Sequence, residues 1–145
     1  MNYQLNAGFP GVFDTGTSLQ LLVNRLVSSS QGIAFRNKIT VVHEVPRDIL
    51  MIADKTKVIP IIDELLTTFV ANGRNSQIHI SADRYRDIII LNIQDRNNYN
   101  GYALAFSIMS IESQINETGG SLTIDGKQKK IATVSFSFPN YAVAS

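Results

Sequence analysis

In three stretches of the chain, apolar residues recur every three or four positions, the spacing that places them on one face of a helix. In the first stretch, Thr17 or Ser18 is a suitable N-cap and Gly32 is the predicted end. The expected amphipathic helices cover residues 17–33, 57–72 and 103–117.

Proline and glycine constrain the ends of the second and third helices. Pro60 has no backbone N–H, so we expect it in or near the first turn, where that donor has no partner within the helix. Gly119 and Gly120 follow the third helix and are typical of a helix C-terminus.

Six shorter runs are rich in β-branched and apolar residues and predict strands. Pro46 separates the first two runs, and the polar sequence "RNNYNG" forms a turn between the fourth run and the third helix. The expected strands cover residues 38–45, 48–53, 76–85, 87–95, 121–126 and 130–139.

This order of elements predicts an α+β fold. The simplest packing is a two-layer α/β sandwich with three helices on one face of a mixed six-stranded sheet. We expect one domain at 17–139, between a weakly ordered N-terminal extension at 1–16 and a C-terminal tail at 140–145. The deepest burial is predicted for Leu22, Leu26, Leu65, Leu66, Phe69, Ile89, Leu91, Ile93, Leu104, Ile108, Ile111, Phe136 and Phe138.

Composition narrows the class of protein. The 145 residues, 44% of them hydrophobic, suit a single compact core. A net charge of +1 gives no electrostatic sign of binding to nucleic acid or to an acidic membrane. The absence of cysteine excludes disulfides and thiolate chemistry. Because the sequence has no long apolar stretch and no signal-peptide pattern, we expect a soluble, cytoplasmic protein.

The second predicted helix carries a stripe of polar residues. Glu64, Thr68 and Asn72 are spaced by four, so they lie one turn apart on the same helix face. Such a stripe is typical of a solvated helix edge, and it is equally the composition of a polar pocket wall. The residues alone leave both interpretations open.

The order of motifs resembles the ATP-binding domain of sensor histidine kinases, which belongs to the GHKL ATPases together with gyrase, Hsp90 and MutL. "ELLTTFVANG" is similar to the N-box, and "IIILNIQD" to the strand that delivers the aspartate of the first glycine box. "GYALAFSIMSIESQINETGGSLTI" is similar to the second glycine box with its helix. "KITVVHEVPRDILMIAD" and "ATVSFSFP" resemble the strands before the N-box and at the end of the domain, so the resemblance covers about residues 17–139.

The resemblance implies a pocket for ATP and Mg²⁺. Asn72 takes the position of the Mg²⁺ ligand, Glu64 that of the catalytic residue, and Asp95 that of the acceptor for the adenine amino group. The further nucleotide-binding positions that it implies are Thr68, Gly101, Ala103 and Thr133.

The sequence also departs from the family pattern. Residues 96–99 follow Asp95 where the family has glycines, and only five residues separate Asp95 from Gly101, too few for the usual ATP lid. Thr68 replaces the first asparagine of the N-box, and Ala103 replaces a glycine of the second glycine box. We therefore predict a degenerate pocket with weak or lost ATP binding.

The two histidines are interpreted as structural residues. His43 and His79 lie in predicted strands, far apart and without partners at metal-ligand spacing. "HEVPR" is superficially similar to the phosphorylation motif His-Glu-x-x-x-Pro, but its proline comes too early. We predict neither a phosphoacceptor histidine nor a transition-metal site.

Two functions from different classes stay open. One is the ATP-binding domain of a two-component or anti-sigma type signalling protein. The other is a catalytically inactive pseudo-ATPase that serves as a protein–protein interaction module, and whether the chain is an enzyme is therefore undecided. The expected partners are a response regulator, a partner kinase or another signalling protein, or a second copy of the chain.

Overall fold

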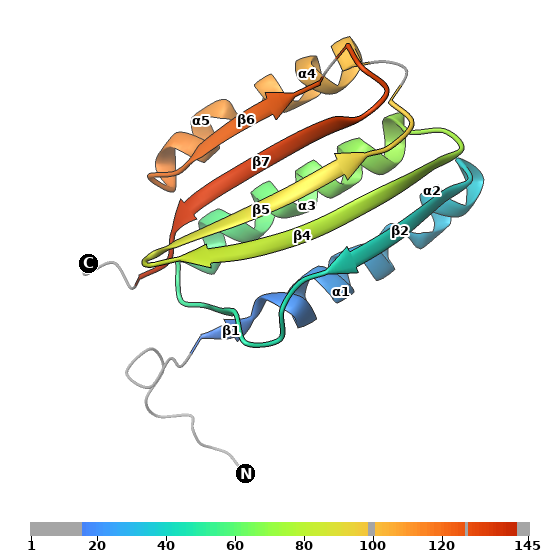
Figure 1. Ribbon diagram of the computed structural model, residues 1–145. Coiled ribbons are helices and arrows are strands. Elements are labelled where there is room, and N and C mark those ends of the chain that lie inside the picture. The colour runs from blue at the N-terminus through green and yellow to red at the C-terminus, as the bar shows by residue number, and fades with distance from the viewer. Residues whose placement is uncertain (1–15, 99–100, 127, 142–145) are drawn as a thin grey trace.

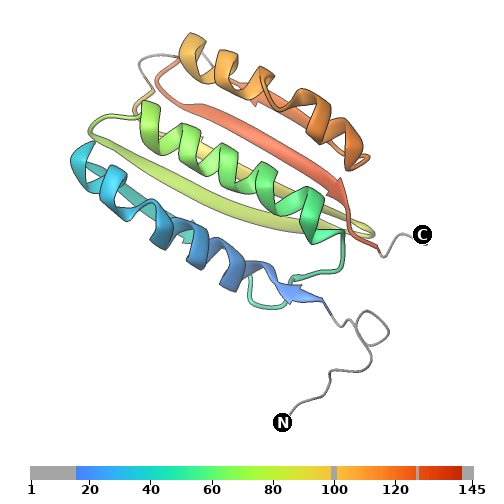
Figure 2. The ribbon, with the colours of Figure 1, turned by 180° about the vertical axis from the view of Figure 1, so that it is seen from behind.

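The computed structural model describes residues 16–98, 101–126 and 128–141, except for the side chains of 101–103. Apart from Gly16, Asn140 and Tyr141, the predicted extension and tail lie outside these residues. Figures 1 and 2 show two layers, with the helices covering one face of a sheet and the other face left open. The predicted α+β sandwich is confirmed.

The main sheet has five strands among the described residues, in the order β2-β4-β5-β7-β6 (Figure 1). β2 and β4 are parallel, and the other neighbours are antiparallel, so the sheet is mixed as predicted. The strands are β2 (Ile39–Glu44), β4 (Ser76–Tyr85), β5 (Ile88–Asp95), β6 (Ser121–Asp125) and β7 (Ala132–Pro139).

The predicted strand at 48–53 does not join this sheet, so the expectation of six strands in one sheet was wrong. Only β3 (Leu50–Met51) forms there, and it pairs with β1 (Thr17–Ser18) in a separate antiparallel sheet. The backbone beside β3 is bound by Asn140, whose Oδ1 accepts hydrogen bonds from the N–H groups of Ile52 and Ala53 at 2.7 and 3.2 Å. The Nδ2 of Asn140 donates to the carbonyl of Leu50 at 2.9 Å. The Asn140 side chain therefore makes hydrogen bonds to this backbone that a strand of the main sheet would otherwise make.

Two of the three predicted helices are each divided in two at a serine. Ser30 ends α1 (Leu19–Ser29) before α2 (Gln31–Arg36), so Gly32 lies inside a helix and is not its end. The second division, between α4 (Gly101–Met109) and α5 (Glu112–Glu117), contains Ser110, whose hydroxyl donates to the carbonyl of Ser107 at 2.6 Å. Serine competes with helical hydrogen bonding in this way, and a run of serines has low helix propensity.

The predicted N-cap of the first helix is confirmed, whereas the predicted start of the second helix was wrong. Ser18 does cap α1, because its hydroxyl oxygen accepts from the N–H of Leu21 at 3.3 Å. α3 (Lys55–Asn72) begins earlier than expected, because Asp54 caps it. Pro60 consequently lies inside the helix, beyond the first turn where we expected it.

The core lies between the helices and the sheet. Alternate residues of β4, β5 and β7 are buried against the helices, and the largest wholly buried side chains include Phe69, Phe136 and Phe138. Every residue predicted to be deeply buried is so, except Leu26, which is half-buried in the last part of α1. No helix of the described residues is long and apolar enough to cross a membrane.

Candidate functional site

The polar stripe on α3 is confirmed as a linked row of side chains. The Thr68 hydroxyl donates to Glu64 Oε2 at 3.3 Å, and Asn72 Nδ2 donates to the backbone carbonyl of Thr68 at 2.9 Å. Glu64 is exposed, Asn72 is half-buried and Thr68 is buried. The stripe is therefore more than a solvated edge, because its middle residue is covered by the rest of the protein.

A tight turn leads from the end of α3 into β4. Gly73 ends the helix, and a Cβ at this position would lie 2.8 Å from Ile39 Cδ1 and 3.0 Å from the carbonyl of Phe69. A larger residue would therefore be crowded by the Phe69 carbonyl and would require the end of the Ile39 side chain to move aside. Asn75 adopts the left-handed conformation with φ of 48°, which asparagine tolerates better than most residues. The turn delivers Ser76 to the first position of β4.

Ser76 meets Asp95, the last residue of β5, in a buried polar cluster. The Ser76 hydroxyl donates a hydrogen bond to Asp95 Oδ1, and the backbone N–H of Asn97 donates to the same oxygen at 2.9 Å. Asp95 is 5% exposed and Ser76 is 8% exposed. At least one oxygen of the carboxylate is thus already bound by groups of the protein.

The Asn97 side chain ties two loops together beside this cluster. Its Nδ2 donates to the carbonyls of Arg74 and Asn75 at 3.3 and 3.1 Å. The loop after β5 is therefore bound to the turn after α3. A glycine, which the resemblance implies for this region, has no side chain to make these bonds.

Asn72 and Asp95 lie on the same side of the sheet. Asp95 follows Leu91 and Ile93 on the face of β5 that the helices cover, and α3 packs on that face. Its partner in β7, Ala132, is wholly buried on the same face. The end of α3 and the end of β5 therefore lie on the same, helix-covered side of the sheet.

Thr133 does not lie with these residues. It pairs with Gln94 across β5 and β7, and Gln94 Nε2 donates to its hydroxyl at 3.3 Å. Because side chains alternate along a strand, Thr133 faces the open side of the sheet while Asp95 and Ala132 face the helices. Thr133 is therefore on the opposite face of the sheet from Asp95, and its role in nucleotide binding stays a prediction.

Gly101 is the first residue of α4, which begins two positions before the predicted start of this helix. The side chain of Ala103 lies outside the described part of the structure. Just before them, Asn98 donates hydrogen bonds from its backbone N–H to the carbonyl of Lys130 at 2.7 Å and from Nδ2 to that of Lys129 at 2.9 Å. The short connection from Asp95 to α4 is thus attached to the end of the β6–β7 hairpin.

The histidines lie on opposite faces of the sheet. His43 pairs with Ile80 and faces the helices, and its Nδ1 is buried without a hydrogen-bond partner in the described structure. His79 faces the open side, with Nε2 2.7 Å from Gln77 Oε1 and Nδ1 3.9 Å from Glu44 Oε1. The described residues contain no cluster of three or more His, Asp or Glu that could hold a metal ion.

Solved structures with the same fold are histidine kinases. The catalytic domain of histidine kinase ThkA has a TM-score of 0.71 at 14% identity, with 88% of this chain and 96% of that chain covered. Full-length ShkA in complex with AMPPNP has a TM-score of 0.74 at 12% identity, covering 90% of this chain and 32% of that chain. Acinetobacter baumannii histidine kinase AdeS has a TM-score of 0.70 at 12% identity, covering 85% and 65%.

No protein-family model matches the sequence, and no curated protein matches it significantly. At these identities the structural likeness establishes the fold. The chain has the fold of a histidine-kinase ATP-binding catalytic domain, as its motifs indicated. It spans less than two thirds of AdeS and about one third of ShkA.

Two residues of the polar cluster around Asp95 were not predicted from the sequence. Ser76 gave no local signal, because its partner Asp95 is 19 positions away. Asn97 was noted only as a departure from the glycine pattern, although an asparagine two residues after a strand-ending aspartate is a recognisable turn former.

Proposed function

We propose that this chain is a histidine-kinase-like ATP-binding domain of a two-component or anti-sigma type signalling protein, with a degenerate pocket that binds ATP weakly or not at all. The observation that carries the proposal is that Asp95 is buried and already hydrogen-bonded by the protein. This carboxylate is the adenine acceptor by resemblance, yet its Oδ1 accepts hydrogen bonds from Ser76 and Asn97 and it is almost wholly buried.

The surroundings of Asp95 are therefore poorly suited to binding adenine. An adenine amino group would need the remaining oxygen of a side chain that is only 5% exposed. The neighbouring Asn97 fills space near the same carboxylate and binds the adjacent turn. The cost of ordering the nucleotide is then offset by few specific contacts.

Asn72 is better suited to its implied role as a ligand of Mg²⁺. Asn72 Nδ2 donates to the Thr68 carbonyl, so the amide oxygen takes no part in that bond, and a neutral oxygen suits Mg²⁺. When bound with ATP, Mg²⁺ would neutralise phosphate charge at this end of α3. Glu64 keeps the catalytic position that the resemblance implies, on the exposed end of the stripe. Gly101 and Ala103 would offer backbone N–H groups of the α4 N-terminus to phosphate.

The shortened connection to α4 supports weak binding further. α4 begins at Gly101, six positions after Asp95, so the segment that covers bound nucleotide in the family has no counterpart of useful length. Loss of two or three contacts worth about 1.4 kcal/mol each would lower affinity roughly a hundred- to a thousand-fold.

Titration with Mg-ATP, followed by calorimetry and by the melting temperature, tests the proposal. We expect no saturable signal at tens of micromolar ATP and at most a small one at millimolar ATP. Asn72→Ala should leave this result unchanged, with Asn116→Ala, an exposed asparagine on α5, as the matched control. Saturable stabilisation at micromolar ATP that Asn72→Ala removes and Asn116→Ala retains would show a working nucleotide site.

The second candidate is a pseudo-ATPase that acts only as a protein–protein interaction module. It is favoured by two large apolar side chains on α4, Phe106 and Met109, which are 78% and 67% exposed. We propose a response regulator, a partner kinase or another signalling protein as the partner, in the cytoplasm. ThkA has been crystallised in complex with the response regulator protein TrrA, which supports a partner of this class. A chain that ignores ATP but binds such a partner would distinguish this function from the first.

A further inference from the structure

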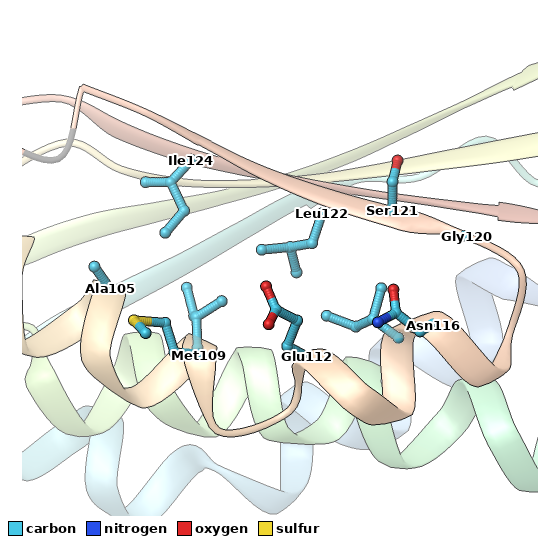
Figure 3. Close-up of a pocket in the computed structure, with 10 residues that line it drawn as sticks. Ala105, Met109, Glu112, Asn116, Gly120, Ser121, Leu122 and Ile124 are labelled. Carbon is cyan, nitrogen blue, oxygen red and sulfur yellow. The ribbon is translucent and has the colours of Figure 1, made fainter.

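A groove of about 430 Å³ lies between helices α4 and α5 and strand β6 (Figure 3). Ile108 and Met109 of α4 form part of one wall, and Leu122 and Ile124 of β6 form the other. Leu122 and Ile124 are only partly buried although they border the core. With Met109 67% exposed, the groove is an apolar surface of the kind that marks an interaction site.

One wall of the groove is a strand edge. Among the described residues, β6 pairs with β7 alone, so the backbone groups on its other side have no neighbouring strand there. Edge strands are usually guarded by lysine, proline or a bulge. The sequence Ser-Leu-Thr-Ile-Asp of β6 contains none of the guarding residues, and its single charge is Asp125 at the last position.

The alternation along β6 determines what an added strand would place in the groove. Leu122 and Ile124 pair with Phe136 and Val134, which are buried on the helix-covered face. A strand added beside β6 would direct every second side chain to that same face, beneath α4 and α5. Its other side chains would continue the polar, helix-free face of the sheet.

The groove contains a negative charge without a positive one. Figure 3 shows the Glu112 carboxylate rising from α5 toward Leu122. In the part of the chain that the structure describes, no basic residue lines the groove, and the Glu112 carboxylate has neither an ion pair nor a hydrogen bond. Charge complementarity therefore favours an occupant with a lysine or arginine at this point.

We propose that the groove binds an extended segment of a partner protein, which adds as a strand to β6. The segment carries aliphatic residues at alternate positions and a lysine or arginine that faces Glu112. A second copy of this chain is a poor occupant through β6, because that strand offers no cation and brings another Asp125. The interaction is independent of ATP and of the proposed nucleotide pocket.

Fluorescence anisotropy with two labelled peptides tests this proposal on the full chain. The first peptide is Val-Thr-Lys-Ser-Ile-Thr-Val-Thr, which presents its lysine on the same side as its aliphatic residues, and the second has glutamate in place of lysine. We expect the lysine peptide to bind about three- to fivefold more tightly. Glu112→Lys should reverse this preference, while Glu117→Lys, the same change on the same helix outside the groove, should retain it.

Two further measurements test whether the peptide binds in the groove and along the edge of β6. Met109→Ser, at an exposed position, should weaken both peptides without changing the melting temperature. Hydrogen exchange should show about half of the β6 amides exchanging rapidly in the free chain, because an edge strand bonds on one side, and slowly with the lysine peptide.

Four outcomes would overturn the proposal. Neither peptide saturates at millimolar concentration, or the charge preference does not respond to Glu112→Lys. The β6 amides are all protected in the free, dilute chain, which would mean that the groove is filled by the chain itself. The chain self-associates and Met109→Ser abolishes this, which would assign the groove to a second copy.

Discussion

Replacing Ser76 by alanine should destabilise the protein through Asp95. The hydroxyl donates to a carboxylate that is only 5% exposed, and the only other donor to that oxygen among the described residues is the N–H of Asn97. Hydrogen bonds to charged groups contribute about 1.5–3 kcal/mol, and a buried acceptor that loses its donor bears much of its desolvation cost. We expect Ser76→Ala to lower the free energy of unfolding by about 2 kcal/mol.

Thermal and urea unfolding at pH 7 measure this loss. A domain of this length changes its melting temperature by about 3 °C per kcal/mol, so a decrease of roughly 6 °C is expected. Ser137→Ala is the matched control, because its hydroxyl bonds Ser121 at 2.9 Å on the exposed face of the sheet. We expect less than about 0.5 kcal/mol for the control. An equal, small effect of both variants would refute the role given to the buried cluster.

Two other predictions concern stability. Gly120→Ala should lower the free energy of unfolding by about 3 kcal/mol or prevent folding, because the new Cβ would lie 2.1 Å from the backbone oxygen of Ser137. Gly32→Ala is the control in urea unfolding. Its new Cβ meets nothing within 4 Å, so the change should be neutral or slightly stabilising. Hydrogen bonds from the Thr56 hydroxyl and N–H lower the pKa of Asp54 below its ordinary value of 3.8. The stabilisation by this N-cap is therefore present above that value and lost as pH falls through the lower folded-state pKa. The melting temperatures of wild type and Asp54→Ala should differ at pH 7 and converge as the pH falls below 3.8. A constant difference across that range would contradict the assignment.

The parts of the fold that the sequence predicted are those decided by local pattern. α3, β4 and β5 show their own period of apolar residues, so their positions were predicted within about two residues. β3 was misjudged because an apolar run looks the same whether it pairs in the main sheet or beside Asn140. The bonds that decide its place join residues 87–90 positions apart, and no local pattern contains them.

The candidate site was predictable to the same extent. The stripe of α3 follows from a spacing of four, and it is linked as that spacing requires. Thr133 lies one position from Ala132, and on a strand a shift of one position reverses the face. The alternation of Ala132, Val134 and Phe136 with polar residues was the signal that placed it on the other side.

The position of the last strand has a consequence for how the protein folds during synthesis. β7 is the final strand in the chain, yet it lies between β5 and β6, and Asn140 just beyond it fastens the backbone beside β3. Until residue 140 has left the ribosome, β5 therefore lacks a neighbour on one side and the segment 50–53 lacks its anchor. Such long sequence separations slow folding and leave strand edges exposed in nascent chains. We expect the nascent domain to depend on chaperones until β7 is released, and then to complete its sheet in one late step.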